Sequence, residues 1–171
     1  MAHYLLVDGY NIIFANPLLE ALAKDNLEDA RKKLSDSLCE YKALTHYRLI
    51  LVFDAHLVAG GTGSVSNYRN IKVVFTKEAE TADQYIEKVA YKYGKKTDHV
   101  TVATSDTLEQ IIIMGSGGNR ISATHFWELV QKKKAEAQSK FKNNRPIKKN
   151  PIESLLDPDT AQKLEEMRYG K

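Results

Sequence analysis

Four aspartates stand where predicted strands end or a predicted helix begins. Apolar runs stop at Asp8, Asp54 and Asp106, and Asp83 lies at the start of a predicted helix. Because the carboxyl ends of parallel strands meet at one edge of a sheet, we expect these side chains to gather there. Gathered carboxylates raise each other's pKa unless a cation joins them. Such a group suits Mg²⁺ or Mn²⁺, and a metal-activated water can hydrolyse a phosphodiester.

Each aspartate alone also fits a structural role. Asp8 can turn the chain or cap a helix, and Asp106 with Glu109 has the spacing of a helix cap and its reciprocal partner. Asp83 is favoured in a first helical turn by the helix dipole, whatever its function. Zinc is disfavoured, because the five histidines show no i, i+4 pair and the chain has one cysteine. The pattern favours a hard cation, with helix capping as the alternative.

The elements that must position these residues alternate between strand and helix. Apolar runs without polar alternation are typical of strands covered on both faces. An amphipathic helix is predicted from about Asn26 to Thr45, and Thr81 with Gln84 has the capping-box spacing of another helix start. Further helices are predicted at Leu108 to Met114, from about residue 124, and after Asp157-Pro158. The predicted strands cover His3–Asp8, Tyr47–Asp54, Ile71–Thr76, Asp98–Asp106 and Arg120–Ala123. This order predicts an α/β fold with a mainly parallel sheet.

Length and composition predict one globular domain. A chain of 171 residues can bury roughly 70% of its unfolded surface without disulfides. The single cysteine, Cys39, lies in a helical pattern with Leu34 and Leu38, so we interpret it as a packing thiol. No signal pattern precedes the first strand, and no apolar run reaches the length of a membrane span. We therefore expect a cytoplasmic protein without a membrane partner.

The segment from His56 to Arg69 is rich in glycine and lacks helical periodicity. It also lacks the Gly-Lys-Ser/Thr ending of a phosphate-binding P-loop. We expect a mobile loop near the strand ends, in which Asn67, Tyr68 and Arg69 contact a partner, with flexible filler as an equal alternative.

The net charge of +3 is unevenly distributed. Residues 129–150 contain eight basic side chains and one acid, a local charge of +7 that leaves −4 for the rest of the chain. A basic flank beside an acidic body attracts a polyanion while the body holds cations. A solvated helix face is the alternative interpretation. The basic residues are Lys132, Lys133, Lys134, Lys140, Lys142, Arg145, Lys148 and Lys149.

Several ordered motifs together resemble one family, over residues 3 to about 140. These motifs are Asp8-Gly9-Tyr10-Asn11, Val52-Phe53-Asp54, Val74-Phe75-Thr76-Lys77-Glu78, Thr81-Ala82-Asp83-Gln84-Tyr85-Ile86-Glu87 and Thr104-Ser105-Asp106. They resemble the YacP-like NYN proteins, which are relatives of the PIN-domain nucleases. The resemblance implies a three-layer α/β/α PIN-like (Rossmann-like) fold with strand order 3-2-1-4-5. We therefore expect a nuclease domain at residues 1–142. Because periodicity is lost past Pro146 until the helix predicted after Asp157, we expect residues 143–171 to be a helical C-terminal extension that packs on or trails from the same domain.

The resemblance also implies a function. It implies a metal-dependent endoribonuclease that uses Mg²⁺ or Mn²⁺ and cleaves mRNA in association with the translating ribosome. By this resemblance Asp8, Asp83 and Asp106 are metal-binding acids, and Asn11 positions a ligand or water beside them. Asp54 and Glu78 match more loosely and are expected to support the site. Our own inference adds Lys132, Lys133, Lys134, Lys148 and Lys149, together with Tyr68 and Arg69, as residues that bind RNA or the ribosome.

Two other classes of function stay open. A haloacid-type phosphatase requires a second aspartate two residues after Asp8, where this chain has Tyr10. A non-catalytic RNA- or ribosome-binding factor would use the lysines and keep the acids only as helix caps. Metal-dependent cleavage of RNA distinguishes that factor from a nuclease.

Overall fold

A six-stranded sheet with β1 (His3–Asp8) near its centre organises the molecule. The computed structural model describes residues 1–58, 61–94, 99–107, 115, 117–144 and 158–168. The strands lie in the order β3-β4-β2-β1-β5-β6, and all are parallel to β1 except β3. The five parallel strands therefore have the predicted order. The other strands are β2 (Arg48–Phe53), β3 (Ser64–Tyr68), β4 (Ile71–Phe75), β5 (His99–Ala103) and β6 (Asn119–Ile121).

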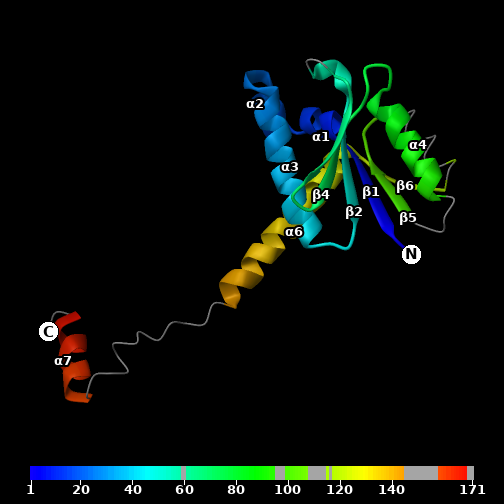
Figure 1. Ribbon diagram of the computed structural model, residues 1–171. Coiled ribbons are helices and arrows are strands. Elements are labelled where there is room, and N and C mark those ends of the chain that lie inside the picture. The colour runs from blue at the N-terminus through cyan, green and yellow to red at the C-terminus, as the bar shows by residue number, and fades with distance from the viewer. Residues whose placement is uncertain (59–60, 95–98, 108–114, 116, 145–157, 169–171) are drawn as a thin grey trace. The chain divides into compact units, whose positions relative to one another are not determined.

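Helices cover both faces of the sheet (Figure 1). On one face Leu5 and Val7 of β1 pack in a core with residues of α1, α2, α3 and the first half of α6. On the other face Tyr4 and Leu6 pack against α4. Since successive strand residues point to opposite faces, the unbroken apolar run of β1 fills both cores. The helices are α1 (Gly9–Ala15), α2 (Pro17–Asp25), α3 (Leu27–Ala43), α4 (Ala82–Gly94), α6 (Ala123–Asn143) and α7 (Pro158–Arg168).

Local signals in the sequence account for several helix starts. The Thr81 hydroxyl accepts a hydrogen bond from the Gln84 backbone at 3.2 Å, and the Gln84 side chain accepts one from the Thr81 backbone at 3.1 Å. This reciprocal pair is the predicted capping box of α4. Cys39 is buried in the core on α3 and its thiol contacts the Tyr68 carbonyl, which confirms the prediction of a packing thiol.

The expected mobile loop between His56 and Arg69 is wrong for its second half. Ser64–Tyr68 forms β3, which pairs antiparallel with β4 from Ser64–Phe75 to Tyr68–Ile71. Its side chains are mostly exposed and its glycines lie ahead of it, so it lacks the apolar run that identified the other strands. Backbone pairing with β4 holds this edge strand, and a sequence pattern does not register backbone pairing.

The chain divides into two compact units, Met1–Glu136 and Ala137–Lys171. The second unit contains the end of α6 and α7, whose start at Pro158 agrees with the predicted helix after Asp157. The boundary between residues 142 and 143 stays a prediction. The predicted helix at Leu108 to Met114, and also Glu109, Lys148 and Lys149, lie outside the described residues. No helix in the described ranges has the length and apolar character to cross a membrane.

Gly9 permits the close packing of α1 against β2. A Cβ atom at this position would lie 2.3 Å from the ring of Phe53, which is itself 1% exposed. The Phe53 ring packs on Tyr10 and Phe75, with centroids 5.1 and 5.4 Å away, and therefore has little freedom to move. Any side chain at Gly9 would displace the start of α1 from the end of β1.

We predict that Gly9→Ala destabilises the fold by about 1–3 kcal/mol, because the added methyl group overpacks the core. Urea denaturation measures this change. Gly115→Ala is the matched control, since a Cβ there has no heavy atom within 4 Å. Equal stabilities of the two variants would contradict the requirement for glycine at position 9.

Candidate active site

Asp8 brings a buried carboxylate to the end of the central strand. The residue is 5% exposed and is the N-cap of α1, where its Oδ1 accepts a hydrogen bond from the Asn11 backbone at 3.2 Å. Burial raises the pKa of Asp8 to about 6, and the charges of Asp83 and Asp54 add to the rise although the Asn11 bonds oppose it. The capping alternative is therefore correct for Asp8, but capping alone does not explain a carboxylate that the fold disfavours in its charged form.

Asn11 joins the ends of β1 and β5. Its Nδ2 donates to Asp8 Oδ2 at 3.0 Å, and its Oδ1 accepts from the Ser105 backbone at 3.1 Å. β2 pairs with β1 on one side, and β5, which comes later in the chain, pairs with β1 on the other side. The strand order therefore reverses between β1 and β5. Ligands of open α/β sheets bind at this point, beyond the carboxyl ends of the strands, which we call the carboxyl edge.

Asp54 follows β2 at the same edge and is held in place. It accepts hydrogen bonds from the His56 backbone at 3.1 Å and from the Ala82 backbone, at the start of α4, at 3.2 Å. Its Oδ1 lies 2.6 Å from His56 Nδ1. Burial opposes ionisation, but the His56 and Ala82 hydrogen bonds outweigh it and lower the pKa of Asp54. Asp54 thus stays ionised and joins the segment after β2 to the start of α4. Its supporting role in the site stays a prediction.

Asp83 is an exposed acid in the first turn of α4 and makes no hydrogen bond with the described residues. Although much of the residue is exposed, partial loss of water around its carboxylate raises the pKa of Asp83, and the charges of Asp106 and Asp54 raise it further. Asp106 follows β5, where its backbone donates to the Thr104 hydroxyl at 3.1 Å. Glu78 is exposed in the turn between β4 and α4. The structure therefore brings all the predicted acids to the carboxyl edge.

The donor set at this edge suits a hard cation. The charges of Asp83 and Asp54 raise the pKa of Asp8, and those of Asp106 and Asp54 raise the pKa of Asp83. The carboxylates of all four residues offer only oxygen atoms as ligands. In the described part of the chain, no three His, Cys, Asp or Glu side chains form a ready-made metal cage. Mg²⁺ is usually bound by one or two carboxylates with waters and substrate phosphates, so it needs no such cage. Asp8 and Asp83 are the acids whose raised pKa values a cation would reverse.

The chain matches the family model of the YacP-like NYN domain over residues 5–169. The chain belongs to the YacP-like NYN domain family. It is 41% identical over 169 residues to a Bacillus subtilis (strain 168) protein described as uncharacterized protein YacP, covering 97% of this chain and 96% of that protein.

Two crystal structures of Rae1 (YacP) from Bacillus subtilis resemble the fold closely. One matches with a TM-score of 0.73 and 36% identity, covering 98% of this chain and 95% of that chain. The other, of a point mutant, has the same TM-score and 35% identity, covering 98% and 99%. Membership of the NYN family supports a nuclease-type function, and NYN nuclease domains generally use divalent metals.

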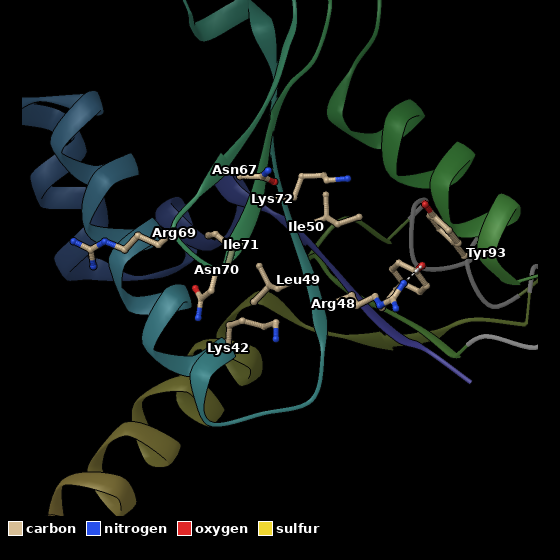
Figure 2. A pocket seen from close by; sticks show the side chains of 11 residues that line it. Lys42, Arg48, Leu49, Ile50, Asn67, Arg69, Asn70, Ile71, Lys72 and Tyr93 are labelled. Carbon is tan, nitrogen blue, oxygen red and sulfur yellow. Dashed lines mark hydrogen bonds between the residues drawn. The ribbon is translucent and has the colours of Figure 1, made fainter.

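The residues predicted to bind RNA are divided between different places. Tyr68 and Arg69 lie at the amino edge of the sheet, where the parallel strands begin, because β3 carries the chain away from the end of β4. Their expected position near the carboxyl edge is therefore wrong. Figure 2 labels Arg69 in the turn between β3 and β4. Lys132 and Lys133 are exposed on α6, whereas Lys134 is ion-paired with Glu40 at 2.9 Å and its side chain is 18% exposed.

Sequence reasoning missed the neutral residues that orient the NYN acids. Ser105 donates its backbone N–H to Asn11, and its hydroxyl accepts from the Ala123 backbone at 3.1 Å, so it links the site to α6. The buried Thr76 hydroxyl accepts from the Ala55 backbone at 3.0 Å and fixes the segment after β2. The only available signal was the position of hydroxyl residues directly after strands. His56 gave none, because its sequence neighbours suggested a loop.

The raised pKa of Asp8 makes stability depend on pH in metal-free protein. The folded state holds the Asp8 proton up to about pH 6, whereas in the unfolded chain the pKa of an aspartate is its ordinary 3.8. Between these values the unfolded state binds fewer protons, so the free energy of unfolding falls as pH rises and then levels off. The difference between these two pKa values corresponds to at most about 3 kcal/mol of unfolding free energy.

We predict that Asp8→Asn removes this dependence, since asparagine also caps a helix but cannot ionise. With EDTA present, the variant should gain stability relative to the wild type by up to about 3 kcal/mol between pH 4 and pH 7. Urea denaturation at both pH values measures the difference. If the difference in stability between the wild type and the variant is the same at pH 4 and at pH 7, Asp8 ionises freely in the folded protein.

Proposed function

We propose that this chain is a metal-dependent endoribonuclease that cleaves mRNA in association with the translating ribosome. The observation that carries the proposal is the buried Asp8, which lies where the strand order of an NYN-domain sheet reverses. Burial and the charges of Asp83 and Asp54 raise the pKa of this carboxyl group. The mRNA substrate and the ribosome rest on the resemblance of the motifs to ribosome-associated members of the family. The basic residues 129–150 support a polyanionic ligand.

The chain's own residues have separate parts in this proposal. Asp8 and Asp83 hold the cation, with Asp106 as a third acid. Asn11 fixes the orientation of Asp8 through its side-chain bond, and its position at the crevice lets it contact a substrate oxygen or water. Asp54 supports the site by holding the start of α4. Glu78 adds negative charge in the turn between β4 and α4. A bound Mg²⁺ or Mn²⁺ would polarise the phosphodiester and lower the pKa of a water.

A non-catalytic RNA- or ribosome-binding factor is the second candidate. It is favoured by the observation that Asp8 caps α1 and Asp54 caps the short 3₁₀ helix Ala55–Leu57, since such acids need no other function. The nuclease accounts for more, because capping requires neither the burial of Asp8 nor an unpaired Asp83 beside it.

We predict that Asp83→Asn lowers metal-dependent RNA cleavage by orders of magnitude and leaves the fold intact. The substitution keeps the shape of the side chain but removes its charge, and Asp83 makes no described hydrogen bond that stabilises the protein. The measurement is cleavage of naked and of translating mRNA with Mg²⁺ or Mn²⁺, with circular dichroism as the folding check. Asp25→Asn, at an exposed acid in α2, is the control.

Melting curves test metal binding independently of cleavage. Saturating cation should raise the melting midpoint of the wild type by linkage and leave Asp8→Asn combined with Asp83→Asn nearly unmoved. Cleavage by a folded Asp83→Asn protein at the wild-type rate would reject the catalytic assignment and favour the binding factor.

The exposed lysines of α6 give a prediction about RNA affinity. If Lys132 and Lys133 each contact a phosphate, each contact contributes roughly 0.7 to the slope of log affinity against log salt concentration. We predict that the double variant Lys132→Gln, Lys133→Gln flattens this slope by about 1.4. Lys134→Gln is the matched control on the same helix, because the Glu40 ion pair already occupies that side chain. Binding of RNA in EDTA at several salt concentrations measures the slopes. Parallel lines for the double variant and the wild type would mean that these lysines form only a solvated face.

A further inference from the structure

The amino edge of the sheet carries a basic hollow. A cavity of about 350 Å³ opens there between the start of the strands and the end of α4. Among the described residues that line it, four are lysine or arginine and none is acidic. They come from different elements: Lys42 from α3, Arg48 from β2, Arg69 from the β3–β4 turn and Lys72 from β4 (Figure 2).

Three of these cations are uncompensated. Arg69 is ion-paired with Asp36 at 3.4 Å, and Figure 2 shows it directed away from Lys72. Lys42, Arg48 and Lys72 make no ion pair with the described residues. Like charges gathered without an acid destabilise the fold, unless an anion binds among them.

Arg48 is held against Tyr4 where it lines the hollow. Its Nη1 donates to the Tyr4 hydroxyl at 3.2 Å and its guanidinium lies 5.7 Å from the centre of the Tyr4 ring. The Tyr4 ring in turn stacks on Tyr93 with centroids 4.0 Å apart. Since the guanidinium has five N–H donors, most of its donors stay available, and their fork geometry matches a phosphate. Asn67, opposite Lys72 in the strand register, adds an amide with no described hydrogen bond.

The hollow lies at the opposite end of the strands from the acids. Six residues of β2 separate the two edges, which is about 20 Å at roughly 3.3 Å per residue. One phosphate cannot contact both sites. Resting on the proposed ribonuclease function, we propose that the hollow binds the phosphate backbone of an RNA segment distinct from the cleaved phosphodiester.

The test compares two doubly substituted proteins with the same change in net charge. Lys42→Gln with Lys72→Gln removes two cations of the hollow, and Lys24→Gln with Lys88→Gln removes two that are ion-paired on α2 and α4. Binding of a long single-stranded RNA in EDTA is measured at several salt concentrations. The hollow variant should lose about tenfold in affinity near 0.15 M salt, and its salt slope should flatten by about 1.4. An equal loss in both variants, or no loss in either, would overturn the site.

Arg48 provides a second comparison, with melting curves as the folding check. Arg48→Lys keeps the charge but loses the fork, so it should bind RNA more weakly than the wild type and more tightly than Arg48→Gln. A competition assay compares polyglutamate with unlabelled RNA at equal total charge. If polyglutamate displaces bound RNA equally well, the hollow is not a phosphate site, and an acidic protein is the better candidate for its partner.

Cleavage separates this proposal from the nuclease itself. An RNA too short to reach from the acids to the hollow should be cut equally by the wild type and by Lys42→Gln with Lys72→Gln. The same variant should show a raised KM and an unchanged kcat on long RNA. Absence of all cleavage would reject the nuclease, while the binding comparison in EDTA would still decide whether the hollow binds RNA.

Discussion

The two hydrogen bonds of the Asn11 side chain are the interaction on which the site depends. One bond holds a buried carboxylate on β1, and the other holds the backbone directly after β5. Parallel strands pair along their length, but nothing in that pairing fixes the segments that leave the sheet at a crevice. An amide can donate to an anion and accept from a peptide N–H at the same time, which neither aspartate nor leucine of similar size can do. Asn11 thus fixes the distance between the ends of β1 and β5. It thereby also fixes the positions of the acids at these ends, Asp8 and Asp106, relative to each other.

The fold supports an unfavourable charge at this point because its core lies directly behind it. Leu6, Val7 and Val52 are fully buried beside Asp8, and their burial supplies stability of the order of 1.5–3 kcal/mol each. A buried carboxylate that titrates near pH 6 costs a similar amount at neutral pH. The central strand can carry the acid only because both of its faces are covered. The buried apolar residues around the end of β1 therefore offset the cost of the Asp8 charge.

Sequence patterns predicted the features that depend on local or periodic burial. The apolar runs located the five parallel strands, and the spacing of Thr81 and Gln84 located the start of α4. They did not predict β3, which has no apolar run and joins the sheet by backbone pairing with β4. They also did not predict the Asp54–His56 contact or the bond from Ser105 to Asn11. Those contacts depend on the tertiary arrangement of loops, which no period in the sequence encodes. The positions of the aspartates at strand ends predicted that they gather at one edge, whereas only coordinates could show which acid is buried.

The distribution of charge follows from the parallel topology. All parallel strands present their carboxyl ends at one edge, so acids placed there gather without any long-range design, and a net negative edge results. The same topology gathers the residues that precede the strands at the opposite edge, where Arg48 and Lys72 occupy first or second positions. Because the two edges are separated by the length of a strand, cations there neither neutralise the acids nor lower their pKa values. Under the proposed functions, a cation would bind at one end of the sheet and an RNA backbone at the other, and one RNA chain long enough to span the sheet would reach both edges.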